Sequence, residues 1–446
     1  MLKSIRLKNF KCYEDSREIE LAPLTIIIGV NNTGKSTIFQ SLLALKQTVR
    51  ARSYRPRLVT KGRYVDLGSF YDILHRKSDD PEGTRKIGIG IKRVGRWEKD
   101  PVPGRADINQ FAADEMQLSF AFNRTTNKIR LAKVNFLVKG ESVLKCNESG
   151  KWDAPHLSQP VRDAVRFHLH NFIPVPHVAD PKSLKDEKLS RAVFEAASTF
   201  NFQGNHWARF FDGIDNVPPH RSHVPFFAVL GEQSASEYGR SGPELLRVLA
   251  GQIQAPNRTP VLLGRLNEWV CKRFEALNKM SLRPIDRAEL LHSLVATDAS
   301  GAENINVAAM GEGISQLLPI VASILLSDED ETLLIEQPEV HLHPKLQSEL
   351  ADLLIEQVKN ENRQLLVETH SEHLLLRIRT HIAKGDITAD KVAVLFVSKK
   401  GGKSTVERLD LNDRGHFGRW PEGFFDESYQ EAMALAMAQP AVSPKK

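Results

Sequence analysis

The sequence predicts an α/β fold: a mixed, mostly parallel sheet with helices packed on it, plus an inserted α+β lobe. Near the start, the apolar run Leu24–Ile28 precedes a glycine-rich turn and an amphipathic helix. Between about residues 290 and 400, short apolar strands alternate with helices, as in a parallel sheet. Hydrophobic residues make up 41% and charged residues 26% of the 446 residues, as in ordinary globular proteins.

Composition excludes several classes of protein. Mean hydropathy is −0.32, and no apolar run approaches the roughly 20 residues that a membrane helix needs. The cysteines Cys12, Cys146 and Cys271 are scattered, which disfavours a disulfide framework or a zinc ribbon and suits a reducing cytoplasm. The net charge of +6 is small for this length and does not by itself indicate a nucleic-acid partner. We therefore expect a cytoplasmic protein with no membrane contact.

The N-terminal elements follow from the spacing of apolar residues. Leu2, Ile5 and Leu7 alternate with polar residues as in a strand, and Glu18–Leu21 is its expected antiparallel partner. Leu24–Ile28 is continuously apolar and β-branched, as in a strand buried on both faces. Beyond the turn, apolar residues recur at helical spacing; they are Ile38, Leu42, Leu43 and Leu45.

The middle of the chain is expected to mix short strands with helices. The predicted strands are Lys86–Ile91, Glu115–Phe122, Lys128–Val138 and Ser142–Lys145. The predicted helices are Leu157–Phe172, Leu184–Phe202 and Val261–Met280. Prolines interrupt this part at several points, which indicates loops between the elements.

The C-terminal elements return to strand–helix alternation. The predicted helices are Glu312–Leu326 and Pro344–Asn360, and the predicted strands are Thr332–Ile335, Leu365–Val367 and Val392–Val397. Because such alternation builds a parallel sheet, we expect the two ends of the chain to share one sheet.

A phosphate-binding loop lies directly after the first buried strand. Gly29–Ser36 reads Gly-Val-Asn-Asn-Thr-Gly-Lys-Ser and fits GxxxxGK[ST] at every fixed position. Glycines let backbone N–H groups converge on phosphate oxygens, Lys35 brings a positive charge to them, and the Ser36 hydroxyl is placed to hold Mg²⁺. The residues expected to contact the nucleotide are Gly29, Asn31, Asn32, Thr33, Gly34, Lys35, Ser36 and Thr37. The similar Gly401–Ser404 lacks the first glycine of the motif, so we interpret it as a hairpin turn.

Further segments supply groups that a bound triphosphate needs. Leu333–Glu339 ends a strand on the carboxylate Glu336, which suits Mg²⁺. A second strand ends at Val367–Ser371 and places His370 where it can reach the γ-phosphate. Met310–Gln316 opens a helix and offers further backbone N–H groups to an anion.

The order of these motifs resembles the ABC-type ATPase heads of the SMC-like and OLD (overcoming lysogenization defect) lineage. The resemblance lies in Leu7–Lys11, in the loop Gly29–Ser36, and in Pro338–Pro344 at the exit of the acidic strand. Met310–Pro319 and Trp420–Phe425 are similar to a subgroup of stand-alone bacterial heads, some of which are ATPase subunits of phage-defence systems such as Septu and PARIS.

The resemblance implies a division of the chain. Residues 1–75 and 215–430 would form the two parts of a P-loop NTPase of the ABC ATPase-head type. Residues 76–214, which the resemblance does not cover, would be the inserted lobe, and residues 431–446 a flexible tail.

The resemblance also implies roles for individual residues. Lys35 and the loop amides would bind ATP, Ser36 and Glu336 would hold Mg²⁺, and His370 would sense the γ-phosphate. The cap residues Gly311, Gly313 and Ser315 would complete the site of a second subunit in a head-to-tail homodimer or higher homo-oligomer. ATP would then hold the subunits together, and the assembly would control a separate effector, a nuclease or a toxin.

One position departs from the family pattern. Where such heads usually carry a glutamate that activates the attacking water, this chain has Gln337. An amide does not accept a proton as a carboxylate does, so general-base help worth typically 10²–10⁴-fold should be missing. Glu339 could replace it only if the turn at Pro338 points it towards the γ-phosphate. We therefore predict slow ATP hydrolysis.

Several residues admit other interpretations. The spacings His341-x-His343 and His370-x-x-His373 occur in zinc sites, although shaping of the loop is the favoured interpretation. The pair His168 and His170 is expected on a solvated helix. No Asp-x-Asp follows His373, so we expect a partner, rather than this chain, to cut nucleic acid.

Two other segments leave their function open. The basic stretch Lys46–Arg63 suits a solvated helix end and loop, and contact with phosphates is the alternative. That alternative belongs with an SMC-like DNA-binding ATPase of repair or segregation. Arg221, in a Pro-x-Arg-like loop, suits a nucleotide or subunit contact and a structural salt bridge equally. Phe424 and Phe425 are expected to pack near Trp420.

Overall fold

The computed structural model describes residues 1–51, 57–75, 85–94, 113–123, 128–179, 184, 186–229, 241–253, 261–287, 291–328, 331–360 and 363–419. Within these ranges no helix is both long and apolar enough to cross a bilayer. The predicted aromatic cluster around Trp420, Phe424 and Phe425 lies outside them.

A six-stranded mixed sheet holds the phosphate-loop strand in its interior. Its order is β11-β16-β17-β3-β18-β19, in which every pairing is parallel except β18–β19. The strands are β3 (Leu24–Ile28), β11 (Ile214–Val217), β16 (Thr332–Glu336), β17 (Gln364–Glu368), β18 (Val392–Lys400) and β19 (Lys403–Leu409). The α/β class, the mostly parallel sheet and the shared sheet of the two chain ends are thus confirmed.

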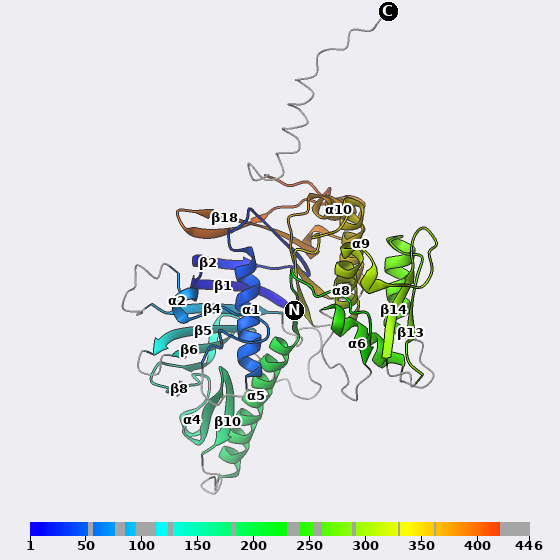
Figure 1. Cartoon of the computed structure of the whole chain (residues 1–446). Helices are drawn as coiled ribbons and strands as arrows, with labels where there is room; N and C mark the ends of the chain where they lie inside the picture. The colour runs from blue at the N-terminus through cyan, green and yellow to red at the C-terminus, as the bar shows by residue number, and fades with distance from the viewer. Residues whose placement is uncertain are drawn as a thin grey trace, which may run out of the picture.

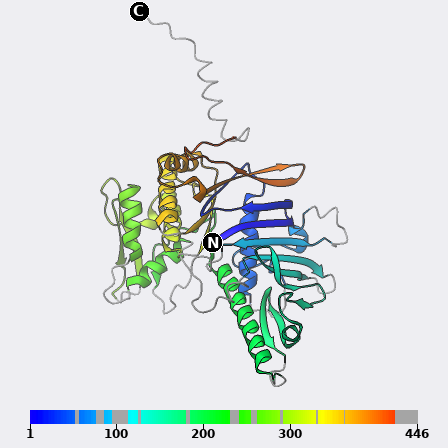
Figure 2. The same cartoon turned by 180° about the vertical axis from the view of Figure 1, so that it is seen from behind.

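Helices cover both faces of this sheet (Figure 1). Residues of β3 alternate between two hydrophobic clusters, with Ile27 in one and Ile26 and Ile28 in the other, because neighbouring side chains of a strand point to opposite faces. The cluster of Ile27 contains α1 (Lys35–Arg50), and the opposite cluster contains α8 (Glu312–Leu326), α9 (Pro344–Asn360) and α10 (Glu372–Ala383). Figure 2 shows the same two sides from behind.

A seven-stranded antiparallel sheet lies beyond α1. Its order is β2-β1-β4-β5-β6-β7-β8, so strands from the middle of the chain extend the hairpin that the N-terminus begins. The strands are β1 (Leu2–Phe10), β2 (Tyr13–Glu20), β4 (Ile87–Arg93), β5 (Glu115–Asn123), β6 (Lys128–Val138), β7 (Glu141–Cys146) and β8 (Trp152–Asp153). The short helix α2 (Phe70–Ile73) packs into the same cluster of buried side chains.

Two smaller units complete the fold. A hairpin of β9 (Val165–His170) and β10 (Ile173–Val178) lies against α4 (Gln159–Ala164) and the long helix α5 (Glu187–Asp212). A four-stranded sheet contains β12 (Ala228–Val229), β13 (Lys279–Pro284), β14 (Leu291–Thr297) and β15 (Ile305–Asn306). This sheet lies with α6 (Gly242–Ile253), α7 (Val261–Leu266), the π-helical segment Asn267–Arg273 and the 3₁₀ turn Val307–Ala309. A further 3₁₀ turn, Ala389–Lys391, leads into β18.

Two predicted helices are wrong in part. Within Leu157–Phe172, the helix ends at Ala164 and the chain continues as β9, because residues 165–170 pair with 173–178 across a turn at Asn171. His168 and His170 therefore lie on a strand, not on a helix. Within Val261–Met280, the α-helix gives way after Leu266 to the π-helical segment, which ends at Arg273, and the chain then enters β13 at Lys279.

The side chain of Asn267 explains the second break. Its Nδ2 donates to the carbonyl oxygens of Leu263 (2.9 Å) and Met280 (3.0 Å), and its Oδ1 accepts from the Met280 N–H (2.8 Å). This asparagine thus binds the start of β13 to the helix, a long-range contact that helical periodicity does not reveal. The predicted turn at Gly401–Ser404 is confirmed as the connection between β18 and β19.

Candidate nucleotide-binding site

The phosphate loop leaves β3 at Ile28 and enters α1 at Lys35. Gly29 and Gly34 have φ values of 146° and 105°, which residues with a side chain rarely adopt. A Cβ at Gly29 would lie 2.2 Å from the carbonyl oxygen of Val397, and one at Gly34 would lie 2.2 Å from Cys12 Sγ. Both positions therefore require glycine, because a side chain would strain the backbone and would clash with neighbouring atoms.

Lys35 is folded over its own loop. Its Nζ donates to the carbonyl oxygens of Gly29 and Val30, each at 2.9 Å. Burial lowers the pKa of Lys35, and the carboxylates of Glu368 and Glu339 oppose that shift. The loop itself is held from behind, because Ser404 Oγ donates to the Thr33 carbonyl oxygen at 2.5 Å. The lysine would exchange its two carbonyl partners for phosphate oxygens when a nucleotide enters.

Ser36 contacts a carboxylate that the sequence interpretation did not single out. Its Oγ donates to Glu368 Oε1 at 2.9 Å. Glu336, the expected partner, lies one strand further away, because β17 separates β16 from β3. The two carboxylates are register partners at the carboxyl ends of neighbouring parallel strands. The available signal was that Gln364–Glu368, like Thr332–Glu336, ends an apolar strand on a glutamate.

Burial raises the affinity of both glutamates for protons. Burial, followed by the charge of Glu368, raises the pKa of Glu336 to about 7, against a hydrogen bond from Asn216. Burial also raises the pKa of Glu368, although Ser36 and Lys35 favour its charged form. A hydroxyl and carboxylates are oxygen ligands of the kind that Mg²⁺ prefers. Glu368 Oε2 is buried without a hydrogen-bond partner among the described residues, so this donor set fits a divalent cation.

Gln337 and Glu339 follow the acidic strand in different surroundings. The Gln337 N–H donates to the carbonyl oxygen of Glu368 at 2.8 Å, with a φ of 45° at Gln337. Glu339 accepts hydrogen bonds of 2.7 Å from Thr369 Oγ1 and from the His370 N–H. Both carboxylate oxygens of Glu339 thus hold the exit of β17.

One cavity of about 450 Å³ joins these parts. Its walls come from the phosphate loop and the start of α1, from Gln337, Glu368 and His370, and from Lys11 and Gln40. Burial, followed by the charge of Lys35, lowers the pKa of His370, and its Nε2 has no partner within the described chain. Sequence reasoning missed Gln40, whose Oε1 accepts from Lys11 Nζ at 2.6 Å.

The helix α8, which carries the cap residues, borders a neighbouring hollow of about 260 Å³. Its lining includes Glu312 and Gln316 of α8 together with Gln337 and His341, so Gln337 borders both hollows. Gly311 is the residue before α8, and a Cβ at Gly313 would lie 2.9 Å from the carbonyl oxygen of His341. Ser315 is buried on the same helix. The cap is thus packed against the exit of the acidic strand, not against its own phosphate loop.

Arg221 ties this cap to the acidic strand. It is buried, and it donates to Gln316 Oε1 (3.2 Å) and to the carbonyl oxygens of Glu336 (3.3 Å) and Gln337 (3.5 Å). Gln316 Nε2 donates back to the Arg221 carbonyl oxygen at 2.9 Å. Burial lowers the pKa of Arg221 to about 10. Of the two open interpretations, the structure supports an internal contact, made to an amide and to carbonyls.

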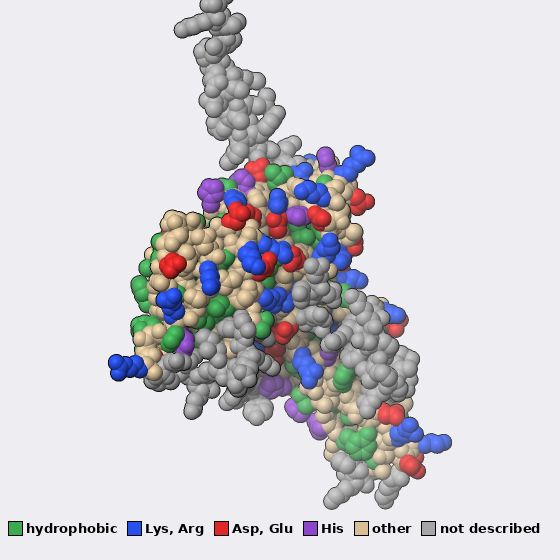
Figure 3. Space-filling model, turned by 90° about the vertical axis from the view of Figure 1, so that its right-hand side faces the viewer, with side chains coloured by type: hydrophobic (Ala, Val, Ile, Leu, Met, Phe, Trp, Pro, Cys, Tyr) green, Lys and Arg blue, Asp and Glu red, His purple; other side chains and the backbone are tan. Residues whose placement is uncertain are grey.

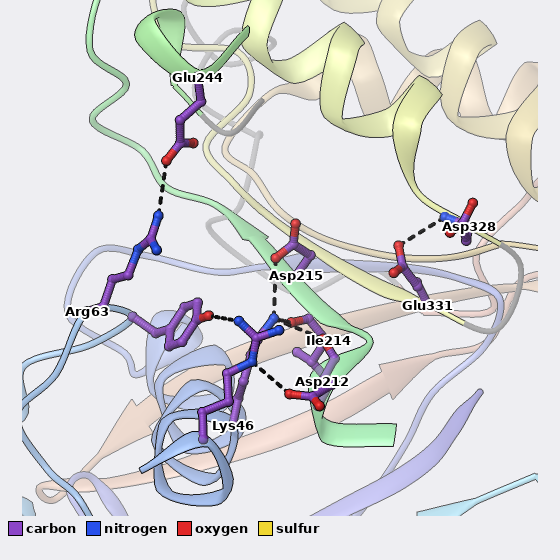
Figure 4. A network of polar contacts seen from close by, with 10 residues as sticks. Lys46, Arg63, Asp212, Ile214, Asp215, Glu244, Asp328 and Glu331 are labelled. Atoms are coloured by element: carbon purple, nitrogen blue, oxygen red, sulfur yellow. Dashed lines mark hydrogen bonds and ion pairs between the residues drawn. The ribbon is translucent and has the colours of Figure 1, made fainter. Parts of the chain in front are cut away.

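The basic stretch Lys46–Arg63 begins in the last turns of α1, and its first residue, Lys46, points inward (Figure 4). Lys46 is only 1% exposed, with its Nζ 3.4 Å from Asp215 Oδ1 and hydrogen-bonded to the Ile214 carbonyl oxygen. The interpretation of a solvated helix end is therefore wrong for Lys46. Arg50 and Arg63 form ion pairs with Asp212 and Glu244.

The histidine spacings do not converge on a metal site in the part of the chain that the structure describes. No group of three or more His, Cys, Asp or Glu side chains suited to a metal ion occurs there. His341 Nδ1 lies 3.3 Å from Glu312 Oε2, and His343 Nδ1 accepts from the Lys345 N–H at 3.3 Å. Both contacts are local to the exit of the acidic strand.

Family models match most of the chain. Residues 1–147 match a model described as "AAA ATPase domain", and residues 157–377 match "AAA domain, putative AbiEii toxin, Type IV TA system". Residues 387–435 match "Protein of unknown function (DUF3696)".

Two curated proteins are homologous to the chain. It is 22% identical over 423 residues to the Endonuclease GajA of Bacillus cereus (strain HuB5-5), covering 84% of this chain and 55% of that protein. It is 48% identical over 42 residues to the OLD nuclease of Thermus scotoductus (strain ATCC 700910 / SA-01), covering 9% of this chain and 8% of that protein. The chain thus spans about half the length of GajA and far less of the OLD nuclease.

Solved SMC heads are similar at low identity. The SMC head domain from Thermotoga maritima is 13% identical with a TM-score of 0.41, covering 92% of this chain and 99% of that one. An SMC head bound to the C-winged helix domain of ScpA is 14% identical with a TM-score of 0.43, covering 92% and 98%.

Proposed function

We propose that this AAA-family ATPase, a homologue of GajA and OLD nucleases, binds ATP with Mg²⁺ and hydrolyses it slowly as a nucleotide-gated homo-oligomer. In this proposal the oligomer controls a separate effector, a nuclease or a toxin, in defence against phage. The link to nucleic-acid cleavage is supported by the two relatives, the Endonuclease GajA and the OLD nuclease.

One observation is the main support for nucleotide binding. Lys35, Ser36, Glu368 and His370 come from distant parts of the chain and border a single cavity of about 450 Å³. Such a volume is in the range of pockets that hold small ligands. The loop amides and the start of α1 supply the fixed positive pole that phosphates need.

Each residue of the site would have a separate role in ATP binding and hydrolysis. Lys35 would bind phosphate oxygens, and Ser36 and the carboxylates would hold Mg²⁺, which when bound neutralises the charge that builds up on the phosphates. His370 would contact the γ-phosphate through Nε2, and the lack of a hydrogen-bond partner for this atom among the described residues supports the role. Gln337 can orient a water through its amide but cannot remove its proton, which supports slow hydrolysis.

The position of the cap supports a composite site. Gly311, Gly313 and Ser315 do not border the cavity of their own phosphate loop. We infer that they close the cavity of a second copy, so that ATP joins two subunits head to tail. A ligand that binds the closed dimer better than the open chain shifts the equilibrium towards the dimer.

Fluorescent ATP binding and oligomer mass test this proposal together. Wild type should bind mant-ATP with Mg²⁺ and gain mass in light scattering when ATP is added. Lys35→Ala should lose both, whereas Lys359→Ala, a lysine in the last turn of α9, should keep both. Absence of mant-ATP binding by the folded wild type would refute the proposal.

An SMC-like DNA-binding ATPase is the alternative, and one surface with several basic side chains is where it would bind DNA. The outer face of β1, β4 and β6 contains a hollow of about 410 Å³ whose lining includes Arg6, Lys8, Lys86, Lys92 and Lys133. Most of these cations pair with acids, for example Arg6 with an aspartate 2.7 Å away. On the face in Figure 3, basic and acidic side chains are also interspersed. DNA affinity that falls steeply with salt and requires ATP would favour this alternative.

A further inference from the structure

A row of polar side chains crosses the carboxyl ends of the parallel strands. It runs from Ser36 after β3, through Glu368 on β17 and Glu336 on β16, to Asn216 on β11. Register-paired residues on neighbouring parallel strands point to the same face of a sheet, so the two carboxylates lie next to each other. At each end of the row a neutral side chain hydrogen-bonds to a carboxylate: Ser36 to Glu368, and Asn216 to Glu336.

Glu368 is the most deeply buried carboxylate of this row. Its exposed fraction is 3%, and the three residues before it on β17 are fully buried leucines and a valine. Oε1 accepts the Ser36 hydroxyl, whereas the buried Oε2 has no hydrogen-bond partner among the described residues. A buried carboxylate with only one hydrogen-bonded oxygen destabilises the fold unless a cation binds the other oxygen.

Lys35 does not supply this cation, because its ammonium group bonds elsewhere. Lys35 Nζ is bonded to the carbonyl oxygens of Gly29 and Val30. Glu336, in turn, hydrogen-bonds with Asn216, on the side away from the phosphate loop. Of the two carboxylates, Glu368 is therefore the one that borders the cavity, next to Ser36.

We propose that Glu368 is a direct ligand of the divalent cation, together with Ser36, and that Glu336 acts from the next strand as the outer carboxylate. The inference rests on the proposed nucleotide site and deepens it. The ligand class is a small, hard cation such as Mg²⁺ or Mn²⁺, because the donors are a hydroxyl and carboxylate oxygens. The cation would thus find two protein ligands before any phosphate arrives.

Manganese binding to the full chain tests this assignment without relying on turnover. Mn²⁺ affinity is measured by electron paramagnetic resonance, first without nucleotide and then with ADP. Glu368→Gln should weaken Mn²⁺ binding at least tenfold more than the matched variant Glu336→Gln, which removes the same charge one strand away. Equal losses, or a larger loss in Glu336→Gln, would overturn the assignment.

Two further measurements keep the result interpretable. Binding of mant-ADP in EDTA reports the nucleotide site alone, and it should persist in Glu368→Gln. Wild-type binding of mant-ADP combined with unchanged Mn²⁺ affinity in Glu368→Gln leaves the proposed function standing and removes this inference. If Glu368→Gln does not fold, Glu368→Asp against Glu336→Asp replaces it: the shortened side chain at 368 should weaken Mn²⁺ binding more, and the reverse order contradicts the proposal.

Discussion

Glu339 Oε1 accepts a 2.7 Å hydrogen bond from the backbone N–H of His370, and its Oε2 accepts another from the hydroxyl of Thr369. This carboxylate, two residues after Gln337, therefore joins the exit of the acidic strand to the exit of β17. To act as a base, Glu339 would have to give up both bonds, so its geometry does not compensate for the amide at 337.

Gln337→Glu should accelerate ATP hydrolysis. The new carboxylate would stand at the edge of the cavity and could take a proton from water, so we expect a gain of roughly 10²-fold in kcat. Phosphate release measures it, and Gln337→Ala should show no gain. An unchanged rate in Gln337→Glu, with ATP binding intact, would falsify the idea that this amide limits turnover.

Arg221→Lys should destabilise the junction between α8 and the acidic strand. A lysine cannot reproduce the fork that reaches Gln316 and the carbonyls of Glu336 and Gln337. We expect a loss of about 2–3 kcal/mol in the free energy of unfolding in urea, from unsatisfied buried acceptors. Arg265→Lys is the matched control, because Arg265 donates to the single carbonyl oxygen of Leu325, and a cost equal to that of Arg221→Lys would contradict this account.

Lys46→Met should be costly because it leaves Asp215 buried without its cation. Breaking such a pair from one side costs about 3–5 kcal/mol, and the double variant Lys46→Met/Asp215→Leu should recover at least half of the loss. Arg50→Met, which removes a partly exposed pair with Asp212, should cost under about 1 kcal/mol. Urea unfolding of wild type, Lys46→Met, Asp215→Leu and the double variant gives the coupling energy, and additive single effects would count against a buried pair.

Asp352 should make the chain sensitive to acid. Burial alone would raise the pKa of Asp352, but hydrogen bonds from Arg377 and His381 outweigh it and hold the pKa below its ordinary value. A lowered folded-state pKa stabilises the fold above the unfolded-state value, near 4, and this contribution disappears as the pH falls through the lower folded-state value.

The comparison is between wild type and Asp352→Asn. Wild type should lose unfolding free energy more steeply below about pH 4, while the exposed Asp410→Asn should follow wild type. Parallel curves for wild type and Asp352→Asn would show that the cluster contributes nothing to acid stability.

The phosphate loop could be predicted from the sequence because its determinants are local. Two glycines, Lys35 and Ser36 lie within eight consecutive residues, between a strand and a helix. The role of Glu368 could not be predicted in the same way. Which strand end lies next to Ser36 depends on the order β16-β17-β3, and no residue within either strand encodes that order.

The helix predictions failed where distant contacts compete with local periodicity. Residues 165–170 have an apolar spacing that a helix could use, yet they pair with a strand that contains Pro174 and Pro176. Asn267 similarly redirects its helix through bonds to Met280. In both places, tertiary pairing decides the structure, and propensity is only a weak guide.

The interior position of β3 has a consequence for biosynthesis. Its two neighbours, β17 and β18, begin at Gln364 and Val392, so the ribosome must make most of the protein before the strand of residues 24–28 is flanked. Contacts between residues so far apart in the chain form slowly. The nascent polypeptide therefore carries a complete phosphate-loop motif long before the strand ends that border its pocket have been made.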